Sequence, residues 1–306
     1  MKLAFGIPNL MQVKAITSPW ETRVDGAEMV KLAKWADKLG FEMIAVPEHF
    51  VIPRQHVEFS GAHHVAAYPA MAFFAGATER IRVNSCIALL PLQNPIVTAK
   101  MLSTMDWLSS GRVTVTFASG WLKGEFDAMG IPFHERGAMA DEYIDAIIEL
   151  WTKENPEFAG KYVNFRDIAF EPKCFQKPHL QVWFGGSADA VLRRIARHAS
   201  GWWPAQITPE DIPARIDFIK SQPDYNGRLG EVFLGYKPGQ ITEDHTPIAG
   251  QSSRGGHTKQ EIVDRLCWYK ELGITMSSAP APEIDSVEAY YDYTQWIAEE
   301  IMPAIS

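Results

Sequence analysis

The chain has 306 residues, of which 46% are hydrophobic and 22% are charged, a balance typical of a soluble globular protein. Its formal net charge of −8 argues against a nucleic-acid partner, and no apolar run reaches the roughly eighteen residues of a membrane-spanning helix, so we expect neither partner. The three cysteines, Cys86, Cys174 and Cys267, are far apart and odd in number, which predicts reduced thiols in the cytoplasm.

Short apolar runs alternate with amphipathic helical patterns along the whole chain. The apolar runs predict eight strands, at Leu3–Ile7, Met43–Val46, Arg82–Leu89, Val113–Phe117, Val182–Phe184, Gly201–Pro204, Val232–Tyr236 and Ile274–Ser277. The helical patterns predict helices near Gly26–Leu39, Tyr68–Ala77, Pro95–Ser109, Arg136–Thr152, Ala188–His198, Pro209–Ser221, Thr258–Leu272 and Ser286–Met302. Asp25 and Ser286 are typical helix starts, and Gly40 and Gly273 are typical stops.

Eight successive strand–helix units favour an α/β fold, a (β/α)8 TIM barrel that forms a single domain over residues 1–306. The alternative is a doubly wound sheet, which usually carries a Gly-x-Gly-x-x-Gly turn after its first strand. Here the first strand ends in Gly6-Ile7-Pro8-Asn9, which lacks those glycines. The sequence therefore favours the barrel.

Three stretches interrupt the alternation, at Val51–His64, Glu154–Pro178 and Pro238–Gly256. The first and third directly follow strands, so we expect them to be insertion loops over the C-terminal face, where barrel active sites form. The second contains Phe158–Phe165, whose pattern predicts a small hairpin. Long irregular loops in compact domains are often functional, and we expect the first and third to select the substrate.

The segment Gln181–Ser187 is the most informative stretch of the chain. An apolar run meets Gly185, Gly186 and Ser187, and a helical pattern starts at Ala188, which predicts a strand, a tight turn and a helix N-terminus. Backbone N–H groups and the helix dipole favour an anion at such a turn, and a phosphate is one natural ligand. The alternative is an ordinary strand–helix loop whose glycines serve the turn geometry alone.

Other motifs stand at the ends of the predicted strands and in the helices that follow. In chain order they are Pro47-Glu48-His49, Leu89-Leu90-Pro91 with Asn94-Pro95, Ala118-Ser119-Gly120-Trp121, Glu125-Phe126-Asp127-Ala128-Met129-Gly130 and Trp183-Phe184-Gly185-Gly186-Ser187. With these motifs, over roughly residues 1–205, the chain resembles the bacterial luciferase-like monooxygenases and their deazaflavin relatives. The pattern is most similar to the subgroup presumed to use coenzyme F420.

The resemblance implies an enzyme on the same barrel, usually a homodimer, with reduced FMN or reduced F420 at the C-terminal mouth. Members that use F420 move a hydride to or from a small organic substrate, and this function is slightly favoured. The alternative is a reduced-FMN-dependent monooxygenase that inserts oxygen into a small organic substrate. A third hypothesis is a non-catalytic flavin-binding subunit, as occurs in luciferase-type pairs.

By the same resemblance, His49 is the catalytic residue, an acid or base beside the substrate or the reacting ring. The alternative is a histidine that packs or caps a loop. We expect Glu48 to orient a neighbour rather than to react.

In relatives, the position of Cys86 and Ile87 carries a non-prolyl cis peptide behind the ring of the cofactor. The resemblance therefore implies that both residues contact the cofactor. Without that resemblance, the pair would be an ordinary strand with a buried cysteine, and a catalytic thiol is disfavoured because no charged partner is evident.

Five further positions, and one departure from the family pattern, complete the expected site. Ser119 could bond the phosphate or ribityl chain, and Gly120 would let the cofactor approach the backbone closely. The remaining cofactor contacts, on the phosphate turn, are Gly185, Gly186 and Ser187. Trp121 stands where some F420 enzymes carry a glutamate proton donor, which weakens the case for sugar-phosphate dehydrogenase chemistry.

We expect no metal site. Val51–His64 contains three histidines, His56, His63 and His64, which invite a metal interpretation. The adjacent pair His63-His64 lacks the i, i+4 spacing of a helical zinc site. Surface or packing roles are therefore favoured for all three.

Overall fold

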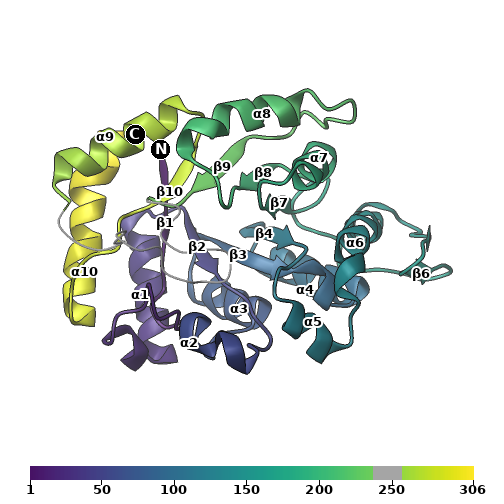
Figure 1. The fold of residues 1–306 in the computed structure, drawn as a ribbon, viewed down its shortest axis with the longest axis horizontal. Coiled ribbons are helices and arrows are strands. Elements are labelled where there is room, and N and C mark those ends of the chain that lie inside the picture. Colours follow the sequence, from purple (N-terminus) through teal and green to yellow (C-terminus); the bar gives the residue numbers. More distant parts are fainter. Residues whose placement is uncertain (237–256) are drawn as a thin grey trace.

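The structure, a computed structural model, describes residues 1–236 and 257–306. Eight strands pair in parallel and close into a barrel in the order β1-β10-β9-β8-β7-β4-β3-β2, with helices around it (Figure 1). The barrel strands are β1 (Lys2–Phe5), β2 (Met43–Val46), β3 (Arg82–Leu89), β4 (Val113–Ala118), β7 (Gln181–Gly185), β8 (Gly201–Trp203), β9 (Glu231–Leu234) and β10 (Met276–Ser278). The barrel expected from the sequence is confirmed.

The helices alternate with these strands along the chain. The longer ones are α1 (Gly26–Leu39), α3 (Ala67–Ala77), α4 (Pro95–Leu108), α6 (Arg136–Thr152), α7 (Asp189–His198), α8 (Ile212–Lys220), α9 (Lys259–Glu271) and α10 (Val287–Trp296). Two short helices, α2 (Val57–Ser60) and α5 (Lys123–Met129), were not expected from the sequence. The expected hairpin is confirmed as β5 (Phe158–Ala159) and β6 (Asn164–Phe165).

The expected helix boundaries hold where capping residues mark them. Asp25 accepts the N–H of Glu28 at the start of α1, and Gly40 ends that helix with φ 86°. Elsewhere the ends differ. β10 begins at Met276 rather than Ile274, because the N–H of Ile274 still donates to Tyr269 of α9. The last expected helix is α10 followed by a π turn and a 3-10 turn over residues 297–305, where Pro303 cannot donate to a regular helix.

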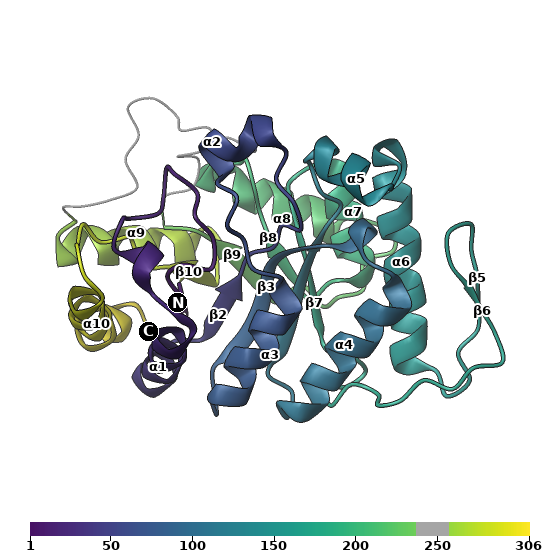
Figure 2. The ribbon, with the colours of Figure 1, turned by 90° about the horizontal axis from the view of Figure 1, so that it is seen from below.

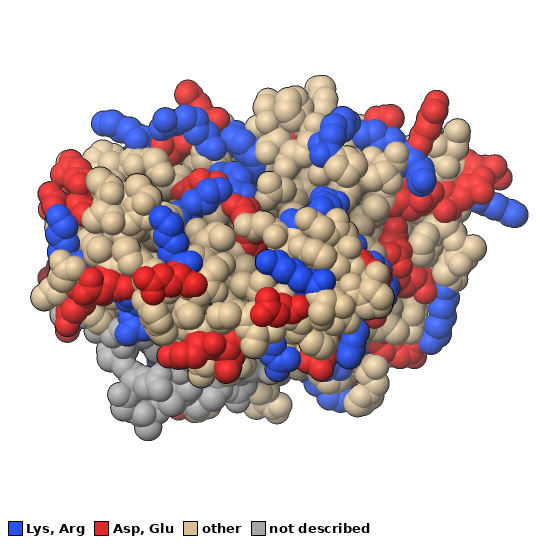
Figure 3. Space-filling view, turned by 90° about the horizontal axis from the view of Figure 1, so that it is seen from above, with Lys and Arg blue, Asp and Glu red and all other residues tan. Residues whose placement is uncertain are grey.

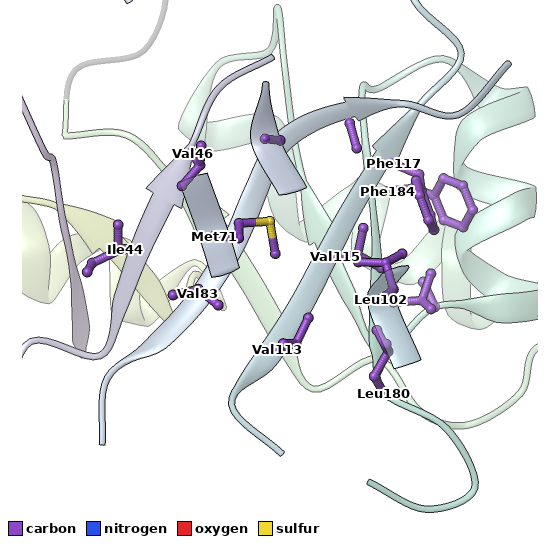
Figure 4. Packing of buried hydrophobic residues seen from close by; sticks show 14 of the residues in the cluster. Ile44, Val46, Met71, Val83, Leu102, Val113, Val115, Phe117, Leu180 and Phe184 are labelled. Atoms are coloured by element: carbon purple, nitrogen blue, oxygen red, sulfur yellow. The ribbon is translucent and has the colours of Figure 1, made fainter. Parts of the chain in front are cut away.

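The main apolar core lies between the outer face of the barrel and the helices. In Figure 4, Ile44 and Val46 of β2 and Val83 of β3 lie near Met71 of α3, and all four are buried. Strands in such a position are covered on both faces, which explains why the sequence shows them as nearly continuous apolar runs. Full burial of one such side chain contributes ~1.5–3 kcal/mol to folding.

A second, smaller apolar cluster fills the inside of the barrel. It contains Met43, Trp183, Phe233 and Met276, all at most 5% exposed. Gly201 of β8 makes room for the indole of Trp183, because a Cβ at position 201 would lie 2.3 Å from its Nε1. The barrel is therefore a packed core rather than a pore.

Charged side chains occupy the N-terminal end of the barrel. Nη2 of Arg82 lies 2.8 Å from Glu231 and 3.0 Å from Glu42, and Nζ of Lys2 lies within 3.1 Å of the same two carboxylates. Nη1 of Arg82 also donates to Gln181. Four of these residues begin or precede strands β1, β3, β7 and β9. The network spans that end, so the C-terminal end is where ligands can be received.

Insertions cover the C-terminal end. The segment after β1 pairs with the Val51–His64 stretch, since the N–H of Gln12 donates to His63 and that of Lys14 to Phe59. Figure 2 shows α2, which belongs to this stretch, and α5 at the same end of the barrel. The expected position of Val51–His64 is therefore confirmed. The other expected loop, Pro238–Gly256, lies outside the described residues.

The surface carries charges of both signs. On the face drawn in Figure 3, Lys and Arg are interspersed with Asp and Glu and form no continuous basic stripe. Within residues 1–236 and 257–306, none of the helices combines the length and apolar composition needed to cross a bilayer.

Candidate active site

The residues expected at the site follow or end four neighbouring strands. His49 comes shortly after β2, Cys86 and Ile87 lie in the second half of β3, and Ser119 and Gly120 follow β4. The turn at residues 185–187 starts at the end of β7. Because β2, β3, β4 and β7 are parallel neighbours in the barrel, these positions share one side of its C-terminal mouth.

His49 is held by a buried carboxylate that comes from α5. Its Nδ1 lies 2.9 Å from Oε2 of Glu125, whose side chain is fully buried, while the His49 side chain is 9% exposed. The other carboxylate oxygen of Glu125 accepts the N–H groups of Phe50 at 2.6 Å and Val51 at 3.3 Å. A carboxylate accepts, so in a neutral ring it is Nδ1 of His49 that carries the proton and donates to Glu125.

Sequence reasoning did not assign a role to Glu125. The residue lies 76 positions from His49, and no local pattern connects them. The sequence carries one signal, the charged residue Glu125 between the apolar residues Leu122 and Phe126. The structure shows that both apolar residues are buried. A carboxylate among apolar neighbours needs a donor, which makes it a candidate for a site.

Glu48 anchors the same loop from the other side. Its carboxylate is buried and accepts the N–H groups of Ala67, at the start of α3, and Leu89, at the end of β3, together with the side-chain amide of Gln93. Desolvation raises the pKa of Glu48 above its usual range. Through these contacts Glu48 ties the loop after β2 to α3 and β3.

Aromatic rings surround His49. Its ring centroid lies 5.0 Å from that of His64 and 6.1 Å from that of Trp121, both edge to face, and His56 packs against the same tryptophan at 5.9 Å. His63 instead pairs with the carbonyl of Asn9. Within the described residues, no three His, Cys, Asp or Glu side chains are grouped as metal ligands.

The strand behind the expected ring position is irregular. The peptide between Cys86 and Ile87 is cis, as the resemblance implied. Pairing between β3 and β4 shifts register between Ser85 and Ala88, so this part of β3 bulges. The Cys86 side chain is half-buried, and desolvation raises the pKa of its thiol to about 12, so the thiol stays protonated near neutral pH.

The turn after β4 is fixed by close packing. Gly120 has φ 83°, and a Cβ there would lie 2.7 Å from the ring of Phe126. Its carbonyl accepts Nε of Arg136, whose guanidinium stacks on Phe133 at 3.8 Å. Ser119, half-buried, directly follows β4 and so lies at the same mouth of the barrel.

The glycine turn before α7 has the geometry of an anion site. Gly186 has φ 112°, and Gly185 packs directly against the side chain of Ile87 in β3, since a Cβ there would lie 2.3 Å from its Cδ1. The hydroxyl of Ser187 donates to the carbonyl of Ala205 and accepts that residue's N–H, which fixes the turn. The N–H groups of Val191 and Leu192 already donate to Ala188, so the N–H groups that α7 leaves for an anion are those before Val191.

The charge at that turn is already balanced. Asp189, in the first turn of α7, lies 2.9 Å from Nη1 of Arg215 in α8. The indole of Trp202 donates to the carbonyl of Gly186. The turn therefore offers backbone donors while its one nearby carboxylate is paired.

A cavity of about 320 Å³ adjoins this mouth on the side of β1 and β10. Pro47 and Cys86 line it from the site described above, and Trp20 lines it from the segment after β1. Tyr290 and Tyr293 of α10 form the far wall. The cavity thus reaches from the expected ring position to the last long helix, and its volume is that of a small-molecule site.

A family model described as luciferase-like monooxygenase matches residues 5–238. The FMNH(2)-dependent dimethylsulfone monooxygenase of Pseudomonas putida is 32% identical over 243 residues, which cover 76% of this chain and 63% of that relative, less than two thirds of its length. Monooxygenase RslO1 from Streptomyces bottropensis has a similar structure, with a TM-score of 0.79 and 20% identity over 100% of both chains. The coenzyme F420-dependent tetrahydromethanopterin reductase of Methanopyrus kandleri also superimposes over 100% of both chains, with a TM-score of 0.72 and 16% identity. At these identities, the structural likeness concerns the fold alone.

Proposed function

Because the chain belongs to the luciferase-like monooxygenase family, we propose that it is an oxidoreductase that uses a reduced flavin-type cofactor on a small organic substrate. One observation carries the proposal: His49, held by Glu125, stands at the same barrel mouth as the glycine turn before α7. The first can hold or move a proton and the second can hold a phosphate. A flavin-type cofactor needs proton transfer and phosphate binding from its protein, because the cofactor itself supplies the redox chemistry.

Two cofactors compete for this site. The motif pattern of the sequence slightly favours F420, whereas the relative at 32% identity is named for FMNH(2). The F420 enzyme is 16% identical, and that likeness supports only the fold. We therefore propose reduced FMN and monooxygenation first, and F420-dependent hydride transfer as the second candidate.

When bound, reduced FMN would give two electrons to O₂, so that one oxygen atom enters the substrate and the other leaves as water, whereas reduced F420 would pass a hydride. In either case Nε2 of His49 accepts or returns the proton of the reaction, while Glu125 holds the ring in one orientation. The N–H groups at the start of α7 hold the phosphate, supported by Gly185, Gly186 and Ser187. Cys86 and Ile87 support the ring.

Ser119 and Gly120 complete the proposed cofactor site. Half-buried Ser119 offers its hydroxyl to the ribityl chain, and Gly120, whose missing side chain leaves room for the ring of Phe126, fixes the turn beside it. Trp121 follows and packs edge-on to His49, where it would exclude water from the proton-transfer position.

We propose that the enzyme is a homodimer that forms through α3 and α4. Helix α3 carries no charged residue, and its exposed positions are Pro69, Ala72, Phe73 and Gly76. Phe73 is 50% exposed, and the neighbouring α4 exposes Val97, Trp107 and Leu108 by 52 to 70%. Figure 2 shows the two helices side by side. Lys100 of α4 is the one exposed charged residue in these two helices, and an apolar face of this kind suits a second copy of itself.

We also propose a reducing compartment, the cytoplasm, for this enzyme. All three cysteines, Cys86, Cys174 and Cys267, are free thiols. Cys174 is buried, and desolvation raises the pKa of its thiol to about 12, which keeps it unreactive. Free thiols of this kind persist where glutathione keeps them reduced.

Cofactor binding and oxygen consumption test the proposal. Purified protein is titrated with FMN and with F420, each oxidised and reduced, and oxygen uptake is then followed with each reduced cofactor. Binding of reduced FMN with substrate-dependent uptake supports the first candidate; F420 binding and turnover without oxygen supports the second. A dissociation constant above about 1 mM for every form, which is only about −4 kcal/mol, would contradict both.

The non-catalytic alternative has its own outcome. A flavin-binding subunit would bind a cofactor at the glycine turn but show no turnover with either reduced cofactor and a panel of small organic substrates. Wild-type activity that His49→Ala leaves unchanged would remove His49 from the mechanism while leaving the cofactor proposal in place.

A further inference from the structure

The inside of the barrel is filled unevenly along its length. Side chains of a strand alternate between its two faces, and Met43 of β2 and Met276 of β10 belong to the cluster inside the barrel, whereas Ile44 belongs to the outer core. The next inward positions toward the C-terminal mouth are therefore Ala45 on β2 and Ser278 on β10. Both carry small side chains.

Strand β1, which lies between β2 and β10 in the barrel, continues this pattern. Ala4 belongs to the inside cluster and Phe5 to the outer core, so the next inward position is Gly6, directly after the strand. Three adjacent strands thus turn small residues inward near the mouth, namely Ala4, Gly6, Ala45 and Ser278. Bulky side chains normally fill the layers of such a barrel, so small ones leave space.

That space is the cavity of about 320 Å³, which all four small residues line. Strands β7, β8 and β9 instead turn Trp183, Trp203 and Phe233 inward, and these three rings do not line the cavity. The cavity is therefore built into the barrel by the distribution of small and large residues among its strands.

Gly6 widens this cavity without being needed by the fold. It does not have a positive φ, and a Cβ added there would meet one atom of the described residues beyond its chain neighbours, Oη of Tyr290 at 3.8 Å. That distance is an ordinary van der Waals contact. At Gly201, by contrast, a Cβ would lie 2.3 Å from the indole of Trp183. Position 6 can therefore carry a side chain, and its absence leaves room for a ligand.

Hydroxyl groups of the cavity wall are already bonded to the backbone. The hydroxyl of Tyr290 donates to the carbonyl of Gly6 at 2.7 Å, and that of Tyr293 donates to Pro280 at 2.6 Å. The hydroxyl of Thr294 donates within α10. A polar ligand would lose its hydrogen bonds to water and compete with these contacts, so the wall favours an apolar one.

Charge restricts the ligand further. Of the described residues that line the cavity, none is Lys, Arg or His, and Glu21 is the one carboxylate. The carboxylate of Glu21 accepts the N–H of Ser18 at 2.7 Å. An ion of either sign would lose hydration on entering, and an anion would find no cation on the wall. The cavity therefore favours a neutral ligand.

We propose that this cavity holds the apolar part of a neutral organic molecule of roughly ten non-hydrogen atoms, and that Gly6 and Ala45 set the largest size it admits. The number of atoms follows from ~30 Å³ for each water-sized group in about 320 Å³. Cys86, at the expected ring position, also lines the cavity, so this molecule is the substrate. That last assignment rests on the proposed function, whereas binding and size selection do not.

The test compares four probes on the purified, cofactor-free chain. The neutral probe of full size is tert-butylbenzene. Benzenesulfonate and phenyltrimethylammonium have the same number of non-hydrogen atoms and a similar shape, but carry a negative and a positive charge, and benzene is neutral but smaller. Binding is followed by NMR of isoleucine methyl groups, because Ile7 and Ile297 line the cavity and Ile219 of α8 does not.

The variants narrow the cavity at the two proposed positions. Gly6→Val and Ala45→Val each add a branched side chain, and valine suits a strand at position 45. The matched control is Gly26→Val, because a Cβ at this first residue of α1 meets no atom of the described residues within 4 Å, and residue 26 does not line the cavity. Thermal unfolding checks that each variant is folded.

In the wild-type chain, tert-butylbenzene should bind more tightly than benzene, because it buries more apolar surface, and about tenfold more tightly than either ion. Gly6→Val and Ala45→Val should each weaken tert-butylbenzene by about tenfold and benzene by less than about threefold, since the larger probe needs the lost space. Gly26→Val should match the wild type. The methyl signals of Ile7 and Ile297 should shift, and that of Ile219 should not.

An ion that binds as tightly as tert-butylbenzene would contradict the neutral ligand. Equal losses of both neutral probes, or no loss of either, in the folded Gly6→Val and Ala45→Val chains would contradict the size limit. Unshifted Ile7 and Ile297 signals with both neutral probes would overturn the site itself.

The same preparations are titrated with FMN and F420. Probe binding without cofactor binding would uphold the cavity and contradict the proposed function. Cofactor binding without probe binding would do the reverse.

Discussion

Nδ1 of His49 lies 2.9 Å from Oε2 of Glu125, and this contact joins the end of β2 to a short helix 76 residues further along the chain. The carboxylate is fully buried, and its second oxygen accepts the backbone of Phe50 and Val51. The imidazole is therefore fixed in orientation and in tautomer, which is what a proton-transfer residue needs.

Glu125→Gln should lower kcat by roughly tenfold to a hundredfold with little change in KM, because the amide can donate to Nδ1 and thereby move the ring proton to Nε2. ¹⁵N NMR of the imidazole reports the tautomer directly. The matched control is Asp127→Asn, which removes an exposed carboxylate from the same helix. Unchanged kcat and tautomer in the folded Glu125→Gln chain would show that the carboxylate does not position His49.

Gly120→Ala should destabilise the fold more than Gly130→Ala. Both glycines have positive φ, 83° and 69°, so both variants incur the ~1 kcal/mol cost of that conformation. Only at position 120 does the new Cβ also meet a ring, that of Phe126, which adds ~1–3 kcal/mol. Urea unfolding measures the difference, and equal losses would contradict the close packing of the β4 turn.

Acid should destabilise the protein in part through His179. Desolvation lowers its pKa to about 4 from 6.5, and Arg228 donates to Nε2, so the folded state resists a second ring proton. Between pH ~6.5 and ~4 the unfolded chain binds more protons, and the free energy of unfolding falls as pH falls, by up to ~3 kcal/mol. Urea unfolding across this range should show a shallower slope for His179→Gln, whereas exposed His134→Gln should keep the wild-type slope.

Phe73→Asp should convert the proposed dimer to a monomer, because it places a charge on an apolar face. Light scattering after gel filtration measures the mass of each species. Ile168→Asp, at a side chain 38% exposed outside α3 and α4, is the control. A wild-type monomer at micromolar concentration, or a dimer that survives Phe73→Asp, would count against this interface.

The regular part of the fold could be predicted from the sequence because its pattern is local. Strand β2 and helix α1 were expected at their observed bounds, since their apolar residues repeat with the period of each element. Helix α5 was not, because it is short and carries Gly124, a poor helix former. The positions of His49 and the glycine turn also came from local motifs.

The contacts that define the site could not be predicted in this way. Glu125 contacts His49, and Trp20 contacts Tyr290, although the members of each pair lie 76 and 270 positions apart in the sequence. Such pairings depend on how the barrel closes. A short stretch of sequence carries no information about that closure. The partner of Ser187, the backbone of Ala205, belongs to the same class.

The salt-bridged N-terminal end, where Arg82 joins Glu231 and Glu42, has a kinetic consequence. In the described part of the chain, charged pairs close that end and apolar side chains fill the barrel, so cofactor and substrate both approach from the C-terminal end. Whichever enters second obstructs the exit of the first. Turnover should then follow a compulsory order, and the residence time of the later ligand should set how fast the site empties.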